Sequence, residues 1–252
     1  LFFLLTLSLG FHVPSDAYAA VDTWTAATTG VGTSIMNGVS MSDANNGVAV
    51  SGTKQIVYTT DGGDTWTDAT TVPESNVGNS SFRGVSMGGA PASYGVAVGY
   101  YGQIVYTNNG GVTWHDATTT NVGTANMWGV SMSDAHNGVA VGNTGTIVYT
   151  TNAGVTWTAA TTTNAGLNNM YAVSMSDAIN GVAVGYSGTI VYTTNGGVDW
   201  TAATTTNVGT AIMRGVSMGD ASNGVAVGDT GQIVYTTNGG VTWTAATTTN
   251  VS

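Results

Sequence analysis

Short apolar segments alternate with small polar residues along nearly the whole chain. The segments are four to six residues long, rich in Val, Ile, Tyr, Thr or Trp, and bounded by Gly, Asn, Asp or Ser. Such segments are typical of short strands joined by tight turns. No window carries apolar residues at helical spacing over the length of a helix. The pattern therefore predicts an all-β protein.

Six tryptophans mark an internal repeat. They are Trp24, Trp66, Trp114, Trp157, Trp200 and Trp243, with spacings of 42, 48, 43, 43 and 43 residues. Each interval holds the same four apolar phrases in the same order. GVSM or AVSM lies at 38–41, 84–87, 129–132, 172–175 and 215–218; GVAV ends at Val50, Val98, Val141, Val184 and Val227; IVYT begins at Ile56, Ile104, Ile147, Ile190 and Ile233; and a TWTAAT-like phrase surrounds each Trp. Four strands in about 43 residues is the size of one propeller blade.

The repeat predicts a β-propeller of four-stranded blades, of which five are visible. The first three phrases each occur five times, whereas the fourth occurs six times. The additional copy of the fourth phrase is at residues 21–28, before the first GVSM. Either five blades close with one copy spare, or the array is part of a larger ring of six or seven blades. An all-β solenoid is the remaining alternative.

The first nineteen residues have the pattern of a secretory signal peptide. An apolar run over residues 1–13 is followed by Pro14 and by Ala17-Tyr18-Ala19, which predicts cleavage after Ala19. The run is shorter than the ~20 residues that span a bilayer, although it could instead be an apolar first strand. We expect an N-terminally truncated signal at 1–19 and one propeller domain at 20–252. The mature protein is then exported (periplasmic, lumenal or extracellular) and has no transmembrane segment.

Charge and cysteine content narrow the function classes. Three Lys or Arg against thirteen Asp or Glu give a net charge of −10. The chain thus lacks the positive surface that phosphates need, which argues against nucleic acid as a partner. The absence of Cys excludes disulfides and thiolate chemistry.

The phrase TTDGGDTW at 59–66 resembles the Asp-box, or BNR repeat, S/T-x-D-x-G-x-T-W. It recurs at 107–114, 150–157, 193–200 and 236–243, with Ala153 in the place of Gly62 and Asp199 in the place of Thr65. We expect the Asp or Asn to cap the turn, Gly to take a positive φ and Trp to pack between sheets. The boxes are thus expected to be structural, through Asp61, Asn109, Asn152, Asn195, Asn238, Trp66, Trp114, Trp157, Trp200 and Trp243.

The wider repeat resembles the photosystem II stability/assembly factor-like family of Asp-box propellers, which have a sialidase-like fold. The resemblance covers roughly residues 21–250. It implies an exported, non-catalytic scaffold for binding or assembly. The photosynthetic members are expected to use a basic patch, and this chain departs from them with only Lys54, Arg83 and Arg214 as basic residues.

Catalysis and metal binding find little support in the residues. Sialidases of this fold use three arginines and this chain has two; Phe82-Arg83-Gly84-Val85 also lacks the Pro of the corresponding sialidase phrase. A glycosidase-like propeller, using two of Asp22, Asp68, Glu74 and Asp116, is kept as an alternative. His115 and His136 occupy different repeat positions, and the phrase at 43–47 is typical of an Asx turn rather than a calcium loop. We expect no enzyme activity, metal or cofactor.

The positions that vary between repeats are the candidate binding residues. Just before each GVSM phrase stand, in turn, Asn37, Arg83, Trp128, Tyr171 and Arg214; the loop after GVAV adds Tyr100, Tyr101 and Tyr186, beside Lys54, Asn143 and Asp229 in other repeats. In a propeller both sets open on one face at the mouth of the channel. Aromatic residues and arginines carry much of the energy of recognition, so we expect a protein or carbohydrate ligand with an acidic group. One alternative is that these positions differ only through sequence drift between repeats and bind nothing. The other is that the protein is a structural cell-surface array.

Overall fold

The computed structural model describes residues 28–29, 34–71, 81–88, 93–120, 122–163, 166 and 168–247. The predicted signal peptide, Trp24, Asp22 and Glu74 lie outside these residues. Among those described, no helix has the length and hydropathy that a bilayer crossing requires.

Within the described residues, twenty-five strands form five sheets. The first sheet holds β1 (Thr28–Thr29), β2 (Met36–Met41), β3 (Gly47–Ser51), β4 (Ile56–Thr59) and β5 (Thr65–Asp68). The second holds β6 (Thr70–Thr71), β7 (Phe82–Gly88), β8 (Tyr94–Gly99), β9 (Ile104–Thr107) and β10 (Thr113–Asp116). The third holds β11 (Thr118–Thr120), β12 (Met127–Met132), β13 (Gly138–Gly142), β14 (Ile147–Thr150) and β15 (Thr156–Ala159). The fourth holds β16 (Thr161–Thr163), β17 (Met170–Met175), β18 (Gly181–Gly185), β19 (Ile190–Thr193) and β20 (Asp199–Ala202). The fifth holds β21 (Thr204–Thr206), β22 (Met213–Met218), β23 (Gly224–Gly228), β24 (Ile233–Thr236) and β25 (Thr242–Ala245).

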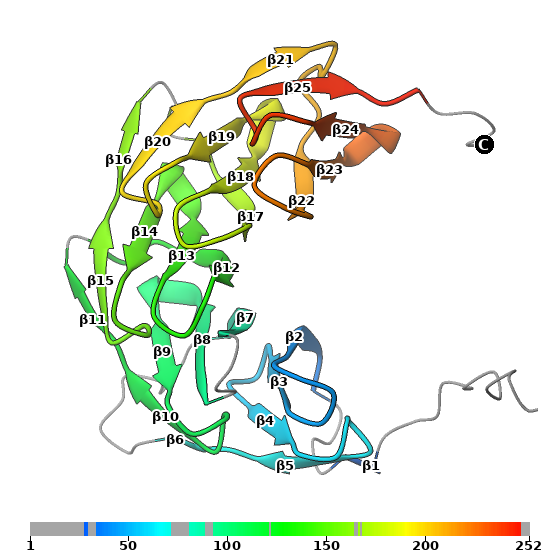
Figure 1. Ribbon diagram of the computed structural model, residues 1–252. Helices are drawn as coiled ribbons and strands as arrows, with labels where there is room; N and C mark the ends of the chain where they lie inside the picture. The colour runs from blue at the N-terminus through cyan, green and yellow to red at the C-terminus, as the bar shows by residue number, and fades with distance from the viewer. Residues whose placement is uncertain are drawn as a thin grey trace, which may run out of the picture.

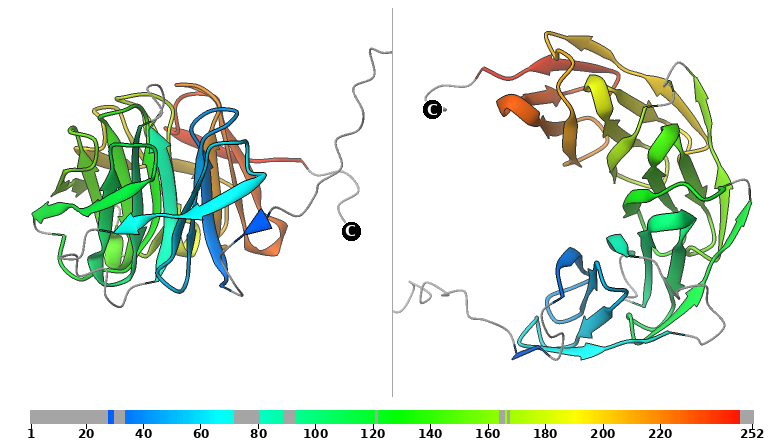
Figure 2. Two further views of the ribbon diagram at one scale, coloured as in Figure 1. Left: turned by 90° about the horizontal axis from the view of Figure 1, so that it is seen from below. Right: turned by 180° about the vertical axis from the view of Figure 1, so that it is seen from behind.

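The sheets stand side by side as propeller blades around a common centre, which confirms the predicted fold (Figure 1). The four predicted phrases form an antiparallel meander in each blade, from the innermost strand outward (β12, β13, β14 and β15 in the third blade). The blades follow an open arc, with the first and fifth at its two ends (Figure 2). A closed ring of five is therefore not the arrangement observed.

Each blade also has a fifth strand that the apolar pattern did not predict. The Thr-rich phrase after one meander pairs in parallel with the outermost strand of the next blade, as in Thr118 to Thr156 and Thr120 to Thr158. This outer strand covers an edge that would otherwise be free to pair with another chain. Consecutive repeats are thereby linked by backbone hydrogen bonds as well as by packing.

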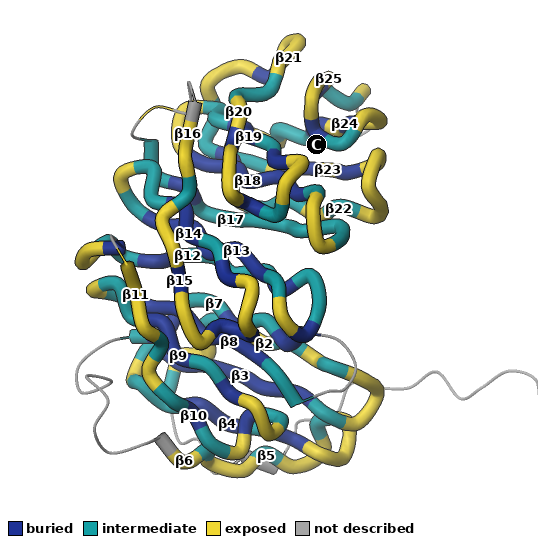
Figure 3. The backbone as a smooth tube through the Cα atoms, turned by 60° about the vertical axis from the view of Figure 1, so that its left-hand side comes forward, coloured by how far each residue is buried: buried dark blue, intermediate teal, exposed yellow. Residues whose placement is uncertain are grey.

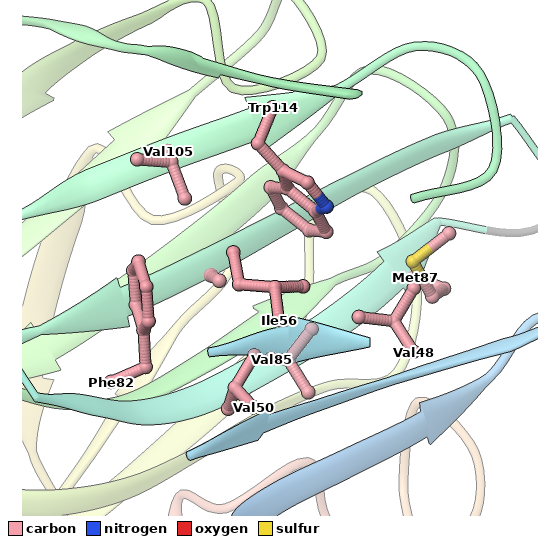
Figure 4. Packing of buried hydrophobic residues seen from close by; sticks show 9 residues of the cluster. Val48, Val50, Ile56, Phe82, Val85, Met87, Val105 and Trp114 are labelled. Atoms are coloured by element: carbon pink, nitrogen blue, oxygen red, sulfur yellow. The ribbon is translucent and has the colours of Figure 1, made fainter. Parts of the chain in front are cut away.

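The hydrophobic core lies between the blades rather than within them. Figure 3 shows burial concentrated in the second and third strands of the blades, such as β13 and β14, whereas the innermost strands are partly buried and the parallel outer strands are exposed. Between the first two blades, Val48, Val50 and Ile56 face Phe82, Val85, Met87, Val105 and Trp114 (Figure 4). Equivalent clusters join the second to the third, the third to the fourth and the fourth to the fifth blade. Burial of each large apolar side chain stabilises the fold by about 1.5–3 kcal/mol.

Each Asp-box residue caps the turn between the third and fourth strands of its blade. Asp61 Oδ1 accepts from the Thr65 amide at 3.0 Å and from the Thr59 hydroxyl at 2.8 Å. The indole Nε1 of Trp66 donates to the Gly63 carbonyl at 3.0 Å. The Asn residues of the other boxes accept the equivalent amide at 2.9–3.0 Å. Asp43, Asp134, Asp177 and Asp220 cap the turns between first and second strands through paired backbone amides.

Candidate functional site

The varying residues of the innermost strands all occupy the same backbone irregularity. The pairing of β7 with β8 shifts register between Phe82 and Gly84, so that Arg83 has no partner across the ladder. The same shift falls at Asn37, Trp128, Tyr171 and Arg214. Sequence analysis placed these residues just before the strand, whereas each is its second residue, at a β-bulge. A bulge turns a side chain out of the regular in-and-out alternation, and all five bulges lie at the same end of the blades.

Short 3-10 turns lie at that end in the second to fifth blades, and in three of these blades a turn residue contacts the bulge residue. They span Tyr100–Gly102, Asn143–Gly145, Tyr186–Gly188 and Asp229–Gly231. Within one blade, the Arg83 guanidinium donates to the Tyr100 hydroxyl, and the Trp128 indole donates to Asn143 Oδ1. Arg214 pairs with Asp229 in the same way. Sequence analysis noted that Asn143 and Asp229 occupy the varying loop position but did not choose them as binding residues, although that shared repeat position was the signal that could have added them.

Aromatic contacts join these pairs from blade to blade. The Arg83 guanidinium carbon lies 4.5 Å from the Tyr100 ring centroid and 5.4 Å from that of Trp128. Trp128 meets the Tyr100 ring edge-to-face at 5.5 Å and the Tyr171 ring at 6.2 Å. The Arg214 guanidinium carbon lies 5.3 Å from the Tyr171 centroid. Arg83, Tyr100, Trp128, Tyr171 and Arg214 thus form a continuous series, which we call the inner arc.

The other candidate residues lie beside the inner arc rather than within it. Asn37 Nδ2 donates to the Phe82 carbonyl at 2.7 Å and so links the first two blades. Tyr101, at a left-handed φ of 59°, projects into solvent and meets Tyr100 at 6.4 Å. Tyr186 is also exposed, on the turn of the fourth blade.

The two arginines of the inner arc differ in electrostatic state. Arg214 donates from Nε and Nη2 to the two carboxylate oxygens of Asp229, at 2.9 and 3.0 Å. This hydrogen bond and charge hold the pKa of Asp229 below, and that of Arg214 above, their ordinary values. Arg83 has aromatic partners and no carboxylate partner among the described residues, and its Nε is buried without a hydrogen bond. Of the two arginines, Arg83 is therefore the one whose positive charge has no carboxylate beside it within the described part of the chain.

Shallow cavities open between blades at the same end. One of about 420 Å³ is lined by Ser34, Ile35, Asn37, Gly52, Thr53, Ser81 and Arg83. A second, of about 610 Å³, lies between the second and third blades; Tyr101, Asn126, Asn143 and Thr144 are among its lining residues. Cavities of this kind can accept side chains of an extended ligand lying along the inner arc.

The residues considered for catalysis and metal binding are placed apart. Asp68 ends β5 and accepts from Gln55, and Asp116 ends β10, so the two carboxylates stand on the outer strands of different blades. His115 stacks on Tyr106 and His136 meets Tyr94. Within the described part of the chain, no cluster of three or more His, Asp or Glu side chains could hold a metal.

Comparison with solved structures places this architecture among known propellers. A structure of YCF48 bound to D1 peptide is 17% identical, with a TM-score of 0.60, and the match covers 84% of this chain and 82% of that one. YCF48 from Cyanidioschyzon merolae is 15% identical, with a TM-score of 0.52, over 84% and 85% of the two chains. The GH74 enzyme of Niastella koreensis is 22% identical, with a TM-score of 0.59, over 82% of this chain but only 30% of the enzyme. At these identities the likeness concerns the fold alone.

The sequence itself carries the family assignment. No curated protein matches the chain. The family described as photosynthesis system II assembly factor YCF48 matches residues 17–169, which is more than half of the chain. This stretch contains the first three complete repeats, with Arg83, Tyr100 and Trp128. The chain therefore belongs to the photosynthesis system II assembly factor YCF48 family.

Proposed function

We propose that the chain is an exported, non-catalytic scaffold that holds an extended segment of a partner protein against the inner arc. The observation that carries the proposal is the continuous contact of Arg83, Tyr100, Trp128, Tyr171 and Arg214 across four blades. Family membership supports a partner that is a protein, since a relative is seen bound to a D1 peptide.

The chemistry of the inner arc favours a segment with one acidic group next to apolar or aromatic residues. Arg83 supplies an uncompensated charge, and a charge-assisted hydrogen bond to a carboxylate is about twice as strong as a neutral one. Trp128 and Tyr171 supply adjacent rings for an apolar side chain. Because these side chains already brace one another, little rotamer freedom would be lost on binding.

Peptide binding measured by calorimetry tests the proposal. The probes are decapeptides with a single Asp among apolar residues, each paired with the same peptide carrying Asn. We expect the Asp peptide to bind more tightly, and Trp128→Ala to weaken it by about thirtyfold, as for a hot-spot aromatic. Tyr94→Ala is the matched control, because Tyr94 begins β8 at the opposite end of the blade. Equal binding of both peptides by both variants would refute a site at the inner arc.

A further inference from the structure

Two neighbouring cavities between the second and third blades meet at Tyr101. The larger is the cavity of about 610 Å³ described above, and the smaller, of about 400 Å³, is lined in part by Gln103, Ile104, Asp116, Ala117 and Thr119. Tyr101 and Gly123 belong to the linings of both. The two cavities are therefore parts of one groove, which we call the interblade groove.

The two blades that form the interblade groove are joined by hydrogen bonds. The Gly102 amide donates to the Ala125 carbonyl at 2.8 Å, and the Tyr101 amide donates to Asn126 Oδ1 at 3.0 Å. Gly102 lies so close to the third blade that a Cβ there would stand 2.4 Å from the Gly123 carbonyl oxygen. The groove is thus formed before a ligand arrives, and little of the protein has to be ordered on binding.

Tyr101 combines an exposed ring with an unfavourable backbone conformation. Its φ is +59° and it is 69% exposed. The same turn position holds Thr144, Ser187 and Thr230 in the next three blades, at φ of 53–59°. A left-handed backbone is uncommon for a bulky residue, and such strain is found mostly at functional sites. The turn itself does not require an aromatic residue, because three smaller residues form it equally well.

The side-chain amide of Gln103 lies in the wall of the interblade groove without a hydrogen bond. Its Nε2 and Oε1 are both buried and have no partner among the described residues. The equivalent Gln55 of the first blade donates to Asp68 at 2.5 Å, whereas Gln103 makes no such bond to Asp116. A buried amide without partners is destabilising. Its N–H donor and C=O acceptor match the backbone amide that an extended peptide presents at each residue.

We propose that the interblade groove holds the next residues of the peptide that lies on the inner arc, with one peptide backbone amide paired to the Gln103 amide beside the Tyr101 ring. This inference rests on the proposed function. The groove adjoins the inner arc at two points. The Tyr101 ring meets the Tyr100 ring at 6.4 Å, and Asn143, which lines the groove, accepts from the Trp128 indole.

The charges around the interblade groove differ from those of the inner arc. Arg83 attracts an acidic residue to the inner arc, whereas the exposed carboxylate of Asp116 repels one from the part of the groove next to β10. We therefore expect the acidic residue of the peptide to lie at the inner arc and neutral residues to lie in the groove.

Calorimetry with the Asp decapeptide and its ester analogues tests the amide pairing. Each analogue replaces one peptide N–H by an ester oxygen and keeps every side chain. Gln103→Leu should weaken binding of the decapeptide by about tenfold. One analogue should bind the unmodified protein about tenfold more weakly than the parent peptide does, and Gln103→Leu should bind the two alike. Gln232→Leu is the matched control, because Gln232 follows the equivalent turn of the fifth blade, and it should leave affinity unchanged.

Tyr101→Gly tests the role of the ring. Glycine relieves the left-handed backbone, so the melting temperature should rise, while loss of the ring should weaken peptide binding by about tenfold. Ser187→Gly makes the same backbone change in the fourth blade, at φ of 57°. It should raise the melting temperature and leave peptide affinity unchanged, which separates the effect of the ring from that of the backbone.

Trp128→Ala distinguishes failure of this inference from failure of the proposed function. If Trp128→Ala weakens peptide binding but Gln103→Leu and Tyr101→Gly do not, the peptide lies on the inner arc alone and the inference is overturned. An ester analogue that loses as much affinity with Gln103→Leu as with the unmodified protein would also overturn the pairing. If the unmodified protein binds no peptide, the proposed function and this inference fail together.

Discussion

Arg214 donates hydrogen bonds to both carboxylate oxygens of Asp229. Arg83 occupies the same position three blades earlier, and its guanidinium instead contacts the rings of Tyr100 and Trp128. The same bulge thus presents one compensated and one uncompensated guanidinium. Because the pair of Arg214 with Asp229 is half-exposed, its net contribution to stability is small. Its more important effect is that Asp229 offsets the positive charge that Arg214 would present to an approaching anion.

Arg83 is therefore expected to dominate the recognition of acidic peptides. Arg83→Gln should weaken binding of an Asp-containing peptide by about tenfold or more, the usual loss for a hydrogen bond to a charged group. Arg214→Gln should change it much less. Calorimetric titration of both variants checks this difference, and an equal loss in both would contradict it.

Removing the carboxylate should release the second arginine. Asp229→Asn keeps the size of the side chain but leaves Arg214 uncompensated, so we expect tighter binding of acidic peptides at low ionic strength. The gain should shrink as salt is raised, because exposed charges are screened over about 10 Å at 0.1 M. The double variant Asp229→Asn/Arg214→Gln serves as the control and should lose the gain.

Ala153 occupies a backbone position that suits glycine. Its φ is +62°, and the other four boxes place Gly62, Gly110, Gly196 and Gly239 there, at φ of 72–79°. Left-handed backbone costs a residue with a Cβ about 1–2 kcal/mol. We expect Ala153→Gly to raise the free energy of unfolding by about 1 kcal/mol and Gly196→Ala to lower it similarly, as measured by urea unfolding. A loss of stability in Ala153→Gly would count against strain at this turn.

Acid should destabilise the first box in particular. The Thr65 hydroxyl, the Thr65 amide and the Thr59 hydroxyl, in that order of effect, lower the pKa of Asp61 to about 2 from 3.8. A depressed folded-state pKa stabilises the protein above the unfolded value, and that contribution is lost as pH falls from about 4 to 2. Asp61→Asn, which copies the other boxes, should leave stability at pH 7 nearly unchanged and flatten its decline over this range. Thermal unfolding at pH 2 to 7 measures the difference.

The tryptophans should contribute unequally to stability. Trp157 is fully buried between the second and third blades, whereas Trp66 is only partly buried. Trp157→Ala should cost about 3–5 kcal/mol, and Trp66→Ala clearly less. Urea unfolding followed by circular dichroism compares the two. Similar losses would contradict the difference in burial between the two tryptophans.

The strands and turns could be predicted from the sequence because each phrase carries its own alternation and its own turn residues. IVYT at 56–59 and GVAV at 47–50 are strands in every repeat for this local reason. The fifth strand was missed because Thr118–Thr120 is exposed and has no apolar alternation; it forms only where the next blade offers an edge. The openness of the arc depends on the angle between packed sheets, which no single phrase encodes.

The varying residues could be found by comparing repeats, but their contacts could not. Nothing local to Arg83 or Trp128 indicates that a bulge turns their side chains toward neighbouring turns, since the bulge arises from the count of residues in two paired strands. For the same reason the pairing of Arg214 with Asp229, fifteen residues apart, became evident only in the folded blade.

The parallel outer strand has a mechanical consequence. Tension applied along the chain reaches Thr118–Thr120 of one repeat and Thr156–Thr158 of the next as opposing pulls on neighbouring parallel strands. Under such a load all hydrogen bonds between the two strands must break together. In an antiparallel hairpin pulled apart from its open end, the hydrogen bonds break one after another. Each outer strand therefore acts as a clamp, and the blades should resist being pulled apart more strongly than their short hairpins alone would allow.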